Sequence, residues 1–453
     1  MKTLKRYLKT INGISHITLN PYGPGAVRIH LIPPKRIKLG ITWVVILNGQ
    51  DVLPLTTGWA ILLREFINTS VEYSGVALTE DMIDQLIKKT IDAVSTVFPK
   101  TKKSMLKKDL KEILSIITDI SKGKAIPLEI GYMTLSKYAK YMSAPHRMDL
   151  MISSMNKDGK WHCNQKCLHC YASCQEMAIV NELTTEKWKE IIDKCKEANI
   201  PQITFTGGEP TLRQDLVELV KHASWFVTRL NTNGVLLTKE LCQELKEASL
   251  DSVQVTLYSY DENIHNTLVG ANNFNKTIEG IKNAIEAGLN VSINTPLCKL
   301  NSDYVKTIEF AQMLGILYYS CSGLIMTGNS LNEQAQDTYL TKEEMISVLT
   351  KATEYCYENG LEISFTSPGW VEEEILRKLK LIVPSCGACL SNMAVAPDGT
   401  VVPCQSWLTE DKLGNMLEDD WKDIWNHPKT KEIRKHTCKY LRACPLASKR
   451  GDK

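Results

Sequence analysis

Three cysteines close together are the residues of this sequence best suited to bind a metal. In the stretch WHCNQKCLHCY they stand at Cys163, Cys167 and Cys170, spaced C-x3-C-x2-C and followed directly by an aromatic residue. A structural zinc site is normally closed by four protein ligands, and the nearest candidates for a fourth are two neighbouring histidines and Cys174. A cubane iron-sulfur cluster held by three thiolates leaves one iron free for another ligand. An open iron of this kind is suited to catalysis.

A second group of five cysteines lies near the end of the sequence. The segment CGACLSNMAVAPDGTVVPC has the spacing C-x2-C-x9-G-x4-C, and its Asp398-Gly399 pair is a hairpin turn signal between two apolar runs. A hairpin there would bring Cys404 back beside Cys389. The five cysteines are Cys386, Cys389, Cys404, Cys438 and Cys444. Thiolates at this spacing suit an iron-sulfur cluster or a zinc ribbon, and the residues alone leave both open.

A glycine-rich loop and several polar strand ends lie between the two cysteine groups. In TFTGGEPTL, residues 204–212, two glycines let the backbone approach a ligand, and their carbonyl groups can accept hydrogen bonds from an ammonium group. Glu209 adds a negative charge. Further polar residues follow the next two apolar runs, in NTNG at 231–234 and TLYSYDENIH at 256–265. Ordinary turn polarity explains the last two segments equally well.

The elements that must position these residues alternate between strand-like and helix-like segments. Apolar runs rich in branched and aromatic residues predict strands at 147–153, 202–206, 225–230, 252–258, 290–294 and 315–320. Amphipathic stretches such as 239–248 and 304–314 separate them. About six strand-helix units argue for an α/β fold, a parallel sheet with right-handed crossovers that is open or curled toward a barrel. Ligands bind such sheets at the carboxyl ends of the strands, and WHCNQKCLHCY follows the first strand.

The first cysteine group resembles the motif of the radical S-adenosylmethionine (SAM) superfamily, C-x3-C-x2-C followed by Tyr or Phe. The resemblance implies a partial (β/α)6 barrel in which Cys163, Cys167 and Cys170 bind a 4Fe-4S cluster. The unique iron of that cluster chelates the amino and carboxylate groups of SAM. It also implies that Tyr171 lies near the adenine.

The loop after the second strand resembles the Gly-Gly-Glu-Pro motif of the same superfamily, which holds the amino group of SAM. That role falls on Gly207, Gly208, Glu209 and Pro210. Strand ends in the superfamily contact the ribose and the carboxylate of SAM, which makes Asn233, Thr256 and Ser259 further candidates. Many relatives carry a basic residue near LVG, where this sequence has Val269, so Arg229 becomes a candidate for the carboxylate contact.

The second cysteine group resembles the auxiliary-cluster domain called SPASM, or its shorter twitch form, and the similarity includes LGNMLEDDWKDIW at 413–425. A full SPASM domain binds two 4Fe-4S clusters, but here Lys435 and Ser448 stand where two further ligands would be expected. The resemblance therefore implies at least one auxiliary cluster. We expect its ligands to be Cys386, Cys389, Cys404 and either Cys438 or Cys444.

The first 145 residues have a different pattern. Residues 1–95 weakly resemble a winged-helix-like α+β domain that grips the leader of a precursor peptide as an added strand, and 96–145 read as a helical linker region. The Lys-rich run PKTKKSMLKKDLKEIL predicts the solvated face of an amphipathic helix, with a patch for an acidic peptide as the alternative. The barrel is expected over 146–335 and the small cysteine-rich SPASM/twitch domain over 336–453.

These resemblances imply an enzyme that cleaves SAM reductively to a 5'-deoxyadenosyl radical. We expect it to modify a ribosomally made precursor peptide oxidatively, through a thioether or carbon-carbon crosslink. Its expected partners are that peptide with its leader and an electron donor such as flavodoxin or ferredoxin. The alternatives are oxidation of a Ser or Cys in a protein such as a sulfatase, a step of cofactor biosynthesis, or a zinc-binding interaction protein.

Composition and charge limit the partners and the compartment. The chain has 453 residues and a formal net charge of +3, too balanced to argue for nucleic acid or an acidic membrane. The basic N-terminus lacks the apolar segment of a signal peptide, and the longest apolar runs are too short to span a bilayer. We therefore expect a cytoplasmic protein without nucleic-acid or membrane partners. A reducing cytosol keeps cysteines free for metal or redox chemistry.

Overall fold

The computed structural model describes residues 2–11, 13–19, 27–34, 42–48, 51–73, 76, 78–121, 124, 133, 142–408, 412–440 and 442–446. These residues fall into two compact units. The N-terminal unit spans residues 1–144 together with 197–201, and the second unit spans 145–196 and 202–453. None of the described helices combines the length and the apolar character needed to cross a lipid bilayer.

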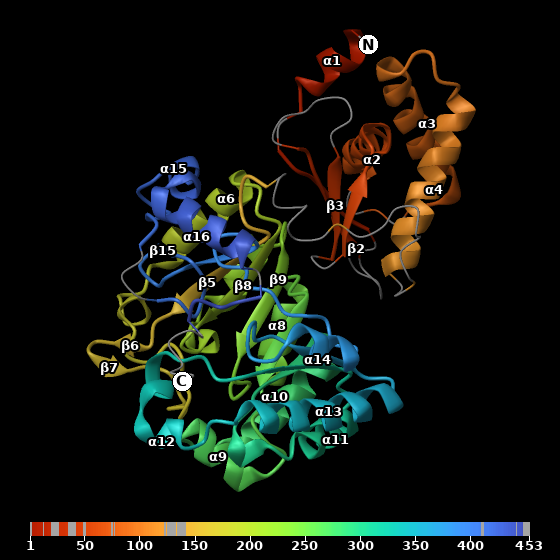
Figure 1. Ribbon diagram of the computed structural model, residues 1–453. Helices are drawn as coiled ribbons and strands as arrows, with labels where there is room; N and C mark the ends of the chain where they lie inside the picture. The colour runs from red at the N-terminus through yellow and green to blue at the C-terminus, as the bar shows by residue number, and fades with distance from the viewer. Residues whose placement is uncertain are drawn as a thin grey trace. The chain divides into compact units, whose positions relative to one another are not determined.

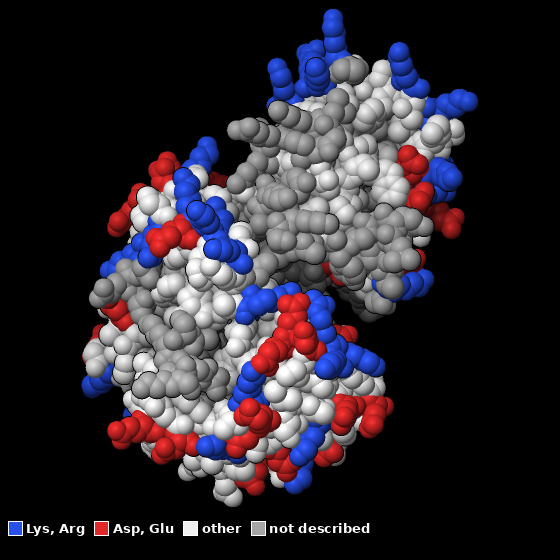
Figure 2. Space-filling model, in the orientation of Figure 1, with Lys and Arg blue, Asp and Glu red and all other residues white. Residues whose placement is uncertain are grey.

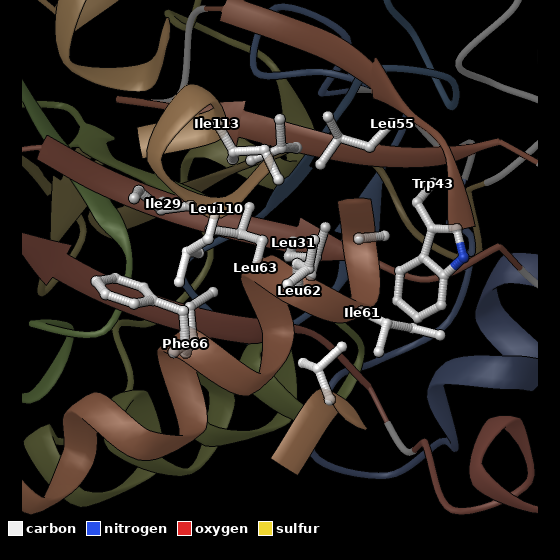
Figure 3. Packing of buried hydrophobic residues seen from close by; sticks show 14 of the residues in the cluster. Ile29, Leu31, Trp43, Leu55, Ile61, Leu62, Leu63, Phe66, Leu110 and Ile113 are labelled. Atoms are coloured by element: carbon white, nitrogen blue, oxygen red, sulfur yellow. The ribbon is translucent and has the colours of Figure 1, made fainter. Parts of the chain in front are cut away.

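The N-terminal unit is a four-stranded antiparallel sheet in the order β1-β2-β3-β4, followed by helices (Figure 1). Its elements are α1 (Lys2–Leu8), β1 (Ser15–Leu19), β2 (Val27–Ile32), β3 (Trp43–Leu47), β4 (Asp51–Leu55), α2 (Thr57–Ser70), η1 (Val71–Tyr73), α3 (Glu80–Val97) and α4 (Lys103–Ser121). Figure 3 shows side chains of the sheet and of α2 packed with Leu110 and Ile113 of α4 in one hydrophobic core. The helix α4, which begins after residue 95, thus packs with the sheet. The predicted border between a domain at 1–95 and a linker at 96–145 stays a prediction.

The Lys-rich run forms α4, as its amphipathic pattern predicts. Leu106, Leu110 and Ile113 are buried, whereas Lys107 and Lys108 are exposed. In Figure 2 the basic side chains of this unit project outward over α1, α3 and α4. Met105 is the exception to the pattern, because its side chain is 55% exposed.

The second unit is built on one nine-stranded sheet in the order β13-β12-β11-β10-β9-β8-β5-β14-β15, parallel except for β15. The sequential order from β5 to β13 is that of a partial (β/α) barrel. Its strands are β5 (Arg147–Ser153), β8 (Gln202–Gly207), β9 (Val227–Thr232), β10 (Ser252–Thr256), β11 (Asn290–Pro296), β12 (Tyr318–Ser322), β13 (Glu362–Phe365), β14 (Asn392–Val395) and β15 (Val401–Val402). The six predicted strands are all present, and β13 and β14 add two further parallel strands.

Helices and short 3-10 turns connect these strands, and Figure 1 places α8, α10, α11 and α13 along the same side of the sheet. They are η3 (Glu176–Ala178), α6 (Thr185–Glu197), η4 (Pro210–Leu212), α7 (Leu216–His222), α8 (Lys239–Glu247), α9 (Glu262–Val269), α10 (Phe274–Glu286), η5 (Lys299–Asn301), α11 (Tyr304–Met313), η6 (Gly328–Leu331), α12 (Glu333–Gln336), α13 (Lys342–Glu358), α14 (Glu373–Lys378), α15 (Trp421–Asn426) and α16 (Pro428–Lys439). A two-residue ladder of β6 (Asn156–Lys157) with β7 (Lys160–Trp161) precedes the first cysteine group.

The two faces of the strands differ in polarity. Apolar residues such as Phe205, Leu230 and Val255 are fully buried, as expected of residues packed beneath the helices. The residues that alternate with them line a cavity instead, and they are Arg147, Thr204, Thr206, Arg229, Asn231, Gln254, Thr256, Asn294, Ser320 and Ser322. Parallel sheets are usually apolar on both faces, so a polar inner face indicates that this barrel binds a ligand in its interior.

The hairpin predicted in the second cysteine group is present. Val395 of β14 pairs with Val401 of β15 across the Asp398-Gly399 turn, and Gly399 has a φ of +90°. The backbone N–H of Cys389 donates to the carbonyl of Pro403 at 3.2 Å. The hairpin therefore brings the backbone next to Cys404 back beside Cys389, as the sequence predicts.

Candidate functional site

One cavity of about 510 Å³ in the second unit contains members of both cysteine groups. Cys163, Cys167 and Cys170 lie on its wall together with the glycine loop after β8. The cavity is also lined by Cys386, Cys404 and Cys444. Segments more than 200 residues apart in the sequence thus meet at a single polar cavity.

The loop that carries the first cysteine group is fixed against the end of α9. The backbone N–H groups of Lys166 and Leu168 donate to the carbonyls of Val269 and Leu268 at 2.9 and 2.8 Å. Gly270 caps α9 with a φ of +64°, and a Cβ atom there would lie 2.5 Å from the carbonyl oxygen of Lys166. Only glycine permits this close approach.

A second segment, residues 327–330, holds the other side of the same loop. The backbone N–H of Asn329 donates to the carbonyl of Cys170 at 3.0 Å, and its side-chain amide donates to the carbonyl of Cys167 at 3.1 Å. The hydroxyl groups of Thr327 and Ser330 donate to the carbonyls of Tyr171 and His169, respectively. We call residues 327–330 the clamp. It satisfies carbonyl groups along the cysteine loop and so fixes the loop's shape.

The three thiol groups of the loop are buried close to one another. The pKa of Cys163 is raised to about 12, chiefly by burial and to a smaller extent by the neighbouring Glu209 and Cys170. The pKa of Cys167 is raised by burial first and then by the two other cysteines of the group. Thiols that raise one another's pKa in this way share one small space, where a cationic cluster would stabilise them as thiolates.

A 4Fe-4S cluster and a single metal ion place different demands on these cysteines. Among the residues the structure describes, no three His, Cys, Asp or Glu side chains stand close enough to hold one metal ion. A cubane spreads its ligands over separate corners, so its cysteines need not converge on one point. Of the two histidines that could complete a zinc site, His169 has its Nε2 2.8 Å from the hydroxyl of Thr338, and His162 lies 3.9 Å from Glu182.

The two glycines at the end of β8 are required because the neighbouring chain at the end of β5 lies too close for a side chain, and not because a ligand needs the space. A Cβ atom on Gly207, whose φ is +138°, would lie 2.2 Å from the carbonyl oxygen of Ser153. One on Gly208 would lie 2.9 Å from the carbonyl oxygen of Ser154. The loop therefore packs directly on the end of β5, which leads into the cysteine loop. Both glycines still line the cavity.

Glu209 is a buried carboxylate with four hydrogen bonds. Its Oε1 accepts the N–H and the hydroxyl of Thr211 at 3.0 and 2.5 Å and the hydroxyl of Thr232 at 2.7 Å, and its Oε2 accepts the N–H of Asn233 at 2.8 Å. Burial raises the pKa of Glu209, while these hydrogen bonds lower it. The side chain thus joins the loop after β8 to the loop after β9.

The remaining residues predicted to contact SAM lie at different depths. Thr256, Tyr171 and Asn233 line the cavity, and Asn233 also donates from Nδ2 to the side-chain oxygen of Asn164 at 2.6 Å. Burial raises the pKa of the Tyr171 phenol, and Cys170, Asp149 and Cys404 raise it further. Pro210 and Ser259 are not among the residues lining the cavity. Pro210 begins η4, and the hydroxyl of Ser259 accepts the N–H of Asp261 at 3.1 Å.

The second cysteine group divides into two sets. Cys386 hydrogen-bonds with Cys444, and both lie near Cys404, whose pKa is raised to about 12, chiefly by burial. Cys389 and Cys438 both lie near Arg434. Burial lowers the pKa of Arg434, and the two thiols raise it. Arg434 also stacks 3.5 Å above the Trp425 ring and donates from Nε to the carbonyl of Cys389 at 3.0 Å.

Several cavity residues were not predicted from the sequence. They are the inward-facing polar residues in the middle of the strands, including Arg147, Asn231, Gln254, Asn294 and Ser320. Each alternates with apolar residues, so the period-two pattern within the strands would have identified them. Because the apolar runs predict strands buried on both faces, functional residues are expected only at the strand ends.

Comparison with known proteins agrees with this geometry. Residues 162–311 match the model of the radical SAM superfamily, and residues 386–445 match that of SPASM, an iron-sulfur cluster-binding domain. A radical SAM domain binds SAM and a 4Fe-4S cluster, and a SPASM domain binds auxiliary iron-sulfur clusters.

Two curated relatives and one solved structure are similar to this chain. Fe-coproporphyrin III synthase of Methanosarcina barkeri is 31% identical over 205 residues, which cover 44% of this chain and 51% of that protein. The PqqA peptide cyclase of Bradyrhizobium diazoefficiens is 37% identical over 142 residues, or 31% of this chain and 37% of that protein. The chain thus spans about half the length of the first relative and a smaller part of the second.

The structure of SuiB from Streptococcus suis bound to the precursor peptide SuiA has a similar fold. The TM-score is 0.58 with 17% sequence identity, over 89% of this chain and 91% of that one. At this identity the likeness supports the fold alone. The two domain matches show that the chain contains a radical SAM domain and, toward its C-terminus, a SPASM domain.

Proposed function

We propose that this enzyme oxidatively modifies a ribosomally made precursor peptide inside its barrel. The observation that carries the proposal is one cavity lined both by Cys163, Cys167 and Cys170 and by Cys386, Cys404 and Cys444. A substrate held in this cavity can lose a hydrogen atom at the first group and an electron to the second, while a proton leaves to the solvent. Together these losses equal two hydrogen atoms, which is the oxidation that forms a thioether or carbon-carbon crosslink.

The residues of the first site fit SAM and its cluster. When bound, the reduced cluster supplies the electron that cleaves SAM to methionine and a 5'-deoxyadenosyl radical, which takes a hydrogen atom from the substrate. Cys163, Cys167 and Cys170 would hold the cluster, and the backbone at Gly207 and Gly208 would bind the amino group of SAM. Asn233 and Thr256 line the cavity where the nucleoside would lie, and Tyr171 would pack against its adenine.

Three of the residues predicted to contact SAM, Glu209, Pro210 and Ser259, fit better as structural supports. The four hydrogen bonds of Glu209 bind the protein itself, and Pro210 starts the turn that follows. The hydroxyl of Ser259 likewise binds the protein itself, because it accepts the N–H of Asp261, the residue before α9. We propose that these residues hold the SAM-binding loops in place and bury them from water, so that the radical reacts with the substrate alone.

For the auxiliary cluster, the hydrogen bond between Cys386 and Cys444 favours Cys444 over Cys438 as a ligand with Cys404. Cys389, which the sequence also predicts as a ligand, is adjacent in the hairpin. The electron that leaves the substrate would pass to this cluster, and a flavodoxin or ferredoxin would serve as the external electron donor.

The N-terminal unit supports a peptide as the substrate. β1 is an edge strand of its sheet, whereas the outer side of β4 already accepts the N–H of Met133 on the carbonyl of Val52 at 3.2 Å. An edge strand can pair with an extended peptide through main-chain hydrogen bonds. We propose that the leader of the precursor binds along β1, Ser15–Leu19.

The test uses the enzyme with reconstituted clusters, SAM, dithionite and synthetic copies of the short peptides encoded beside its gene. We expect one of them to lose two hydrogen atoms by mass spectrometry, with 5'-deoxyadenosine formed in equal amount. The Cys163, Cys167, Cys170→Ala variant should leave that peptide unchanged. Turnover of SAM with no change in any peptide would count against a peptide substrate.

A tetrapyrrole is the second candidate substrate. The similarity to Fe-coproporphyrin III synthase favours it, although that match covers 44% of this chain. The same assay with a set of iron porphyrins and related tetrapyrroles in place of the peptide separates the two, and formation of Fe-coproporphyrin III would match the reaction in that relative's name. Formation of 5'-deoxyadenosine that rises with a tetrapyrrole, but not with any peptide, would replace the peptide proposal.

A further inference from the structure

The inner end of the barrel carries an unbalanced positive charge. Arg147 pairs with Asp149, its Nε lying 2.8 Å from Oδ1 of a carboxylate that is 1% exposed. Arg229, two strands away, also faces this space, since it lines the cavity. Two guanidinium groups thus face one carboxylate.

Few interactions offset the cost of burying the positive charge of Arg229. Its one hydrogen bond within the described part of the chain runs from Nε to the hydroxyl of Ser252, at 3.4 Å. Burial lowers the pKa of Arg229, and Arg147 lowers it further, whereas Asp149 raises it. Burying two cations against one carboxylate is costly, so the terminal nitrogens of Arg229 are suited to receive a further anion.

No other described group of the cavity supplies that anion. Glu209 is the one acidic residue among the described residues lining the cavity, and its carboxylate is engaged by four hydrogen bonds. The neighbouring positions of the cavity wall carry neutral polar side chains: Thr204 pairs with Arg229 across β8 and β9, and Asn231 lies two residues further along β9. A guanidinium with neutral donors is the environment that recognises a carboxylate.

The depth of Arg229 separates it from the expected position of SAM. Arg229 pairs with Thr204, three residues before Gly207, in the register of β8 and β9. At about 3.3 Å per residue, Arg229 lies roughly 10 Å deeper in the barrel than the glycine loop. The amino and carboxylate groups of SAM bind one iron and so lie side by side near that loop. A carboxylate at Arg229 therefore belongs to another molecule.

We infer that Arg229 forms a subsite for a carboxylate of the substrate, an aspartate or glutamate side chain inserted into the barrel next to the residue that is modified. This inference rests on the proposed peptide substrate and specifies its chemistry. The subsite would anchor the peptide beyond the reacting carbon, so that the hydrogen to be removed faces the SAM site.

The test measures binding of two probe tripeptides to the enzyme with reconstituted clusters and SAM, by saturation-transfer NMR. The probes are acetyl-Gly-Glu-Gly-amide and its Gln counterpart. We expect the Glu probe to bind about tenfold more tightly, as a charge-assisted hydrogen bond allows. Arg229→Gln should abolish this preference and Arg229→Lys should keep most of it. Arg377→Gln, an exposed arginine of α14, is the matched control and should change nothing.

The competing source of the carboxylate is SAM itself. Affinities for SAM and for decarboxylated SAM should each stay within about twofold in Arg229→Gln, well below the tenfold effect of one lost charged contact. A loss of affinity for SAM but not for decarboxylated SAM would assign Arg229 to the cofactor and overturn the inference. Equal binding of the two tripeptides by the wild-type enzyme would overturn it as well, even if Arg229→Gln failed to fold. Failure of the proposed function would appear separately, as absence of peptide oxidation.

Discussion

The carboxylate of Glu209 accepts the backbone N–H of Asn233 at 2.8 Å, which joins the loops that follow two neighbouring strands. Asn233 in turn donates to the side chain of Asn164 beside Cys163, so the hydrogen bonds continue into the cysteine loop. A motif read from the sequence as a contact to SAM is therefore also the structural connection between three loops of the site.

Glu209→Gln should weaken this connection. The amide nitrogen would face hydrogen-bond donors, and a buried donor without a partner costs about 1–3 kcal/mol. We expect the free energy of unfolding, measured in urea, to fall by that amount and SAM affinity to fall with it. Glu186→Gln, an exposed change on α6, serves as the control. Equal stability of the Glu209→Gln variant and the wild-type protein would contradict the arrangement of hydrogen bonds described here.

Gly328→Ala should disturb the first cluster by displacing the clamp. A Cβ atom there would lie 2.4, 2.6 and 2.7 Å from the carbonyl oxygens of Cys170, Tyr171 and Ser173. Gly315 and Gly360 also have positive φ angles, +94° and +67°, but open space around them, so their Ala variants control for backbone strain alone. We expect less iron per chain and an altered EPR signal of the reduced cluster in Gly328→Ala only. A normal signal in that variant would exclude a positioning role for the clamp.

The cysteines of the SPASM domain should differ in their effect on the auxiliary cluster. Because Cys444 hydrogen-bonds with Cys386, Cys444→Ser should remove most of the auxiliary iron, measured in the Cys163, Cys167, Cys170→Ala background. Cys438→Ser should remove less, since Cys438 lies beside Arg434. If the two variants retained iron in the opposite order, Cys438 would be the ligand.

His265 should make the stability of the metal-free chain depend on pH. It is fully buried with neither ring nitrogen hydrogen-bonded to the described residues, and burial lowers its pKa to about 4. The unfolded chain binds a proton near pH 6.5 and the folded chain does not, so stability falls as pH drops from 6.5 toward 4. His265→Phe should remove roughly 3 kcal/mol of that fall. Urea unfolding at pH 7 and pH 4 measures it, with His222→Gln as the exposed control; an unchanged pH dependence in His265→Phe would refute the assignment.

The alternation of apolar runs and amphipathic segments was enough to predict the sheet of the second unit. The strand β13 was not predicted, and other errors lie at element ends: β12 starts at Tyr318 rather than at Gly315, because Gly315 forms a turn with positive φ. β4 escaped prediction because Pro54 interrupts its pattern, and an edge strand tolerates that proline.

In the site, too, some features could be predicted from the sequence and others could not. The spacing of the cysteines and of Gly-Gly-Glu-Pro marks the loops that meet at the cavity, since short motifs are local in the sequence. Long-range features could not be predicted, because they depend on which strands face one another. The clamp at Gly328, the pairing of Cys386 with Cys444 and the position of Arg229 are of this kind.

The most direct test of the central claim is the iron and acid-labile sulfide content of anaerobically purified protein, compared between the wild type and the Cys163, Cys167, Cys170→Ala variant. Two cubanes, one at each cysteine group, predict about eight irons per chain in the wild type and about four in the variant. Little iron in either protein, with one zinc per chain unaffected by the triple change, would contradict the assignment of both sites.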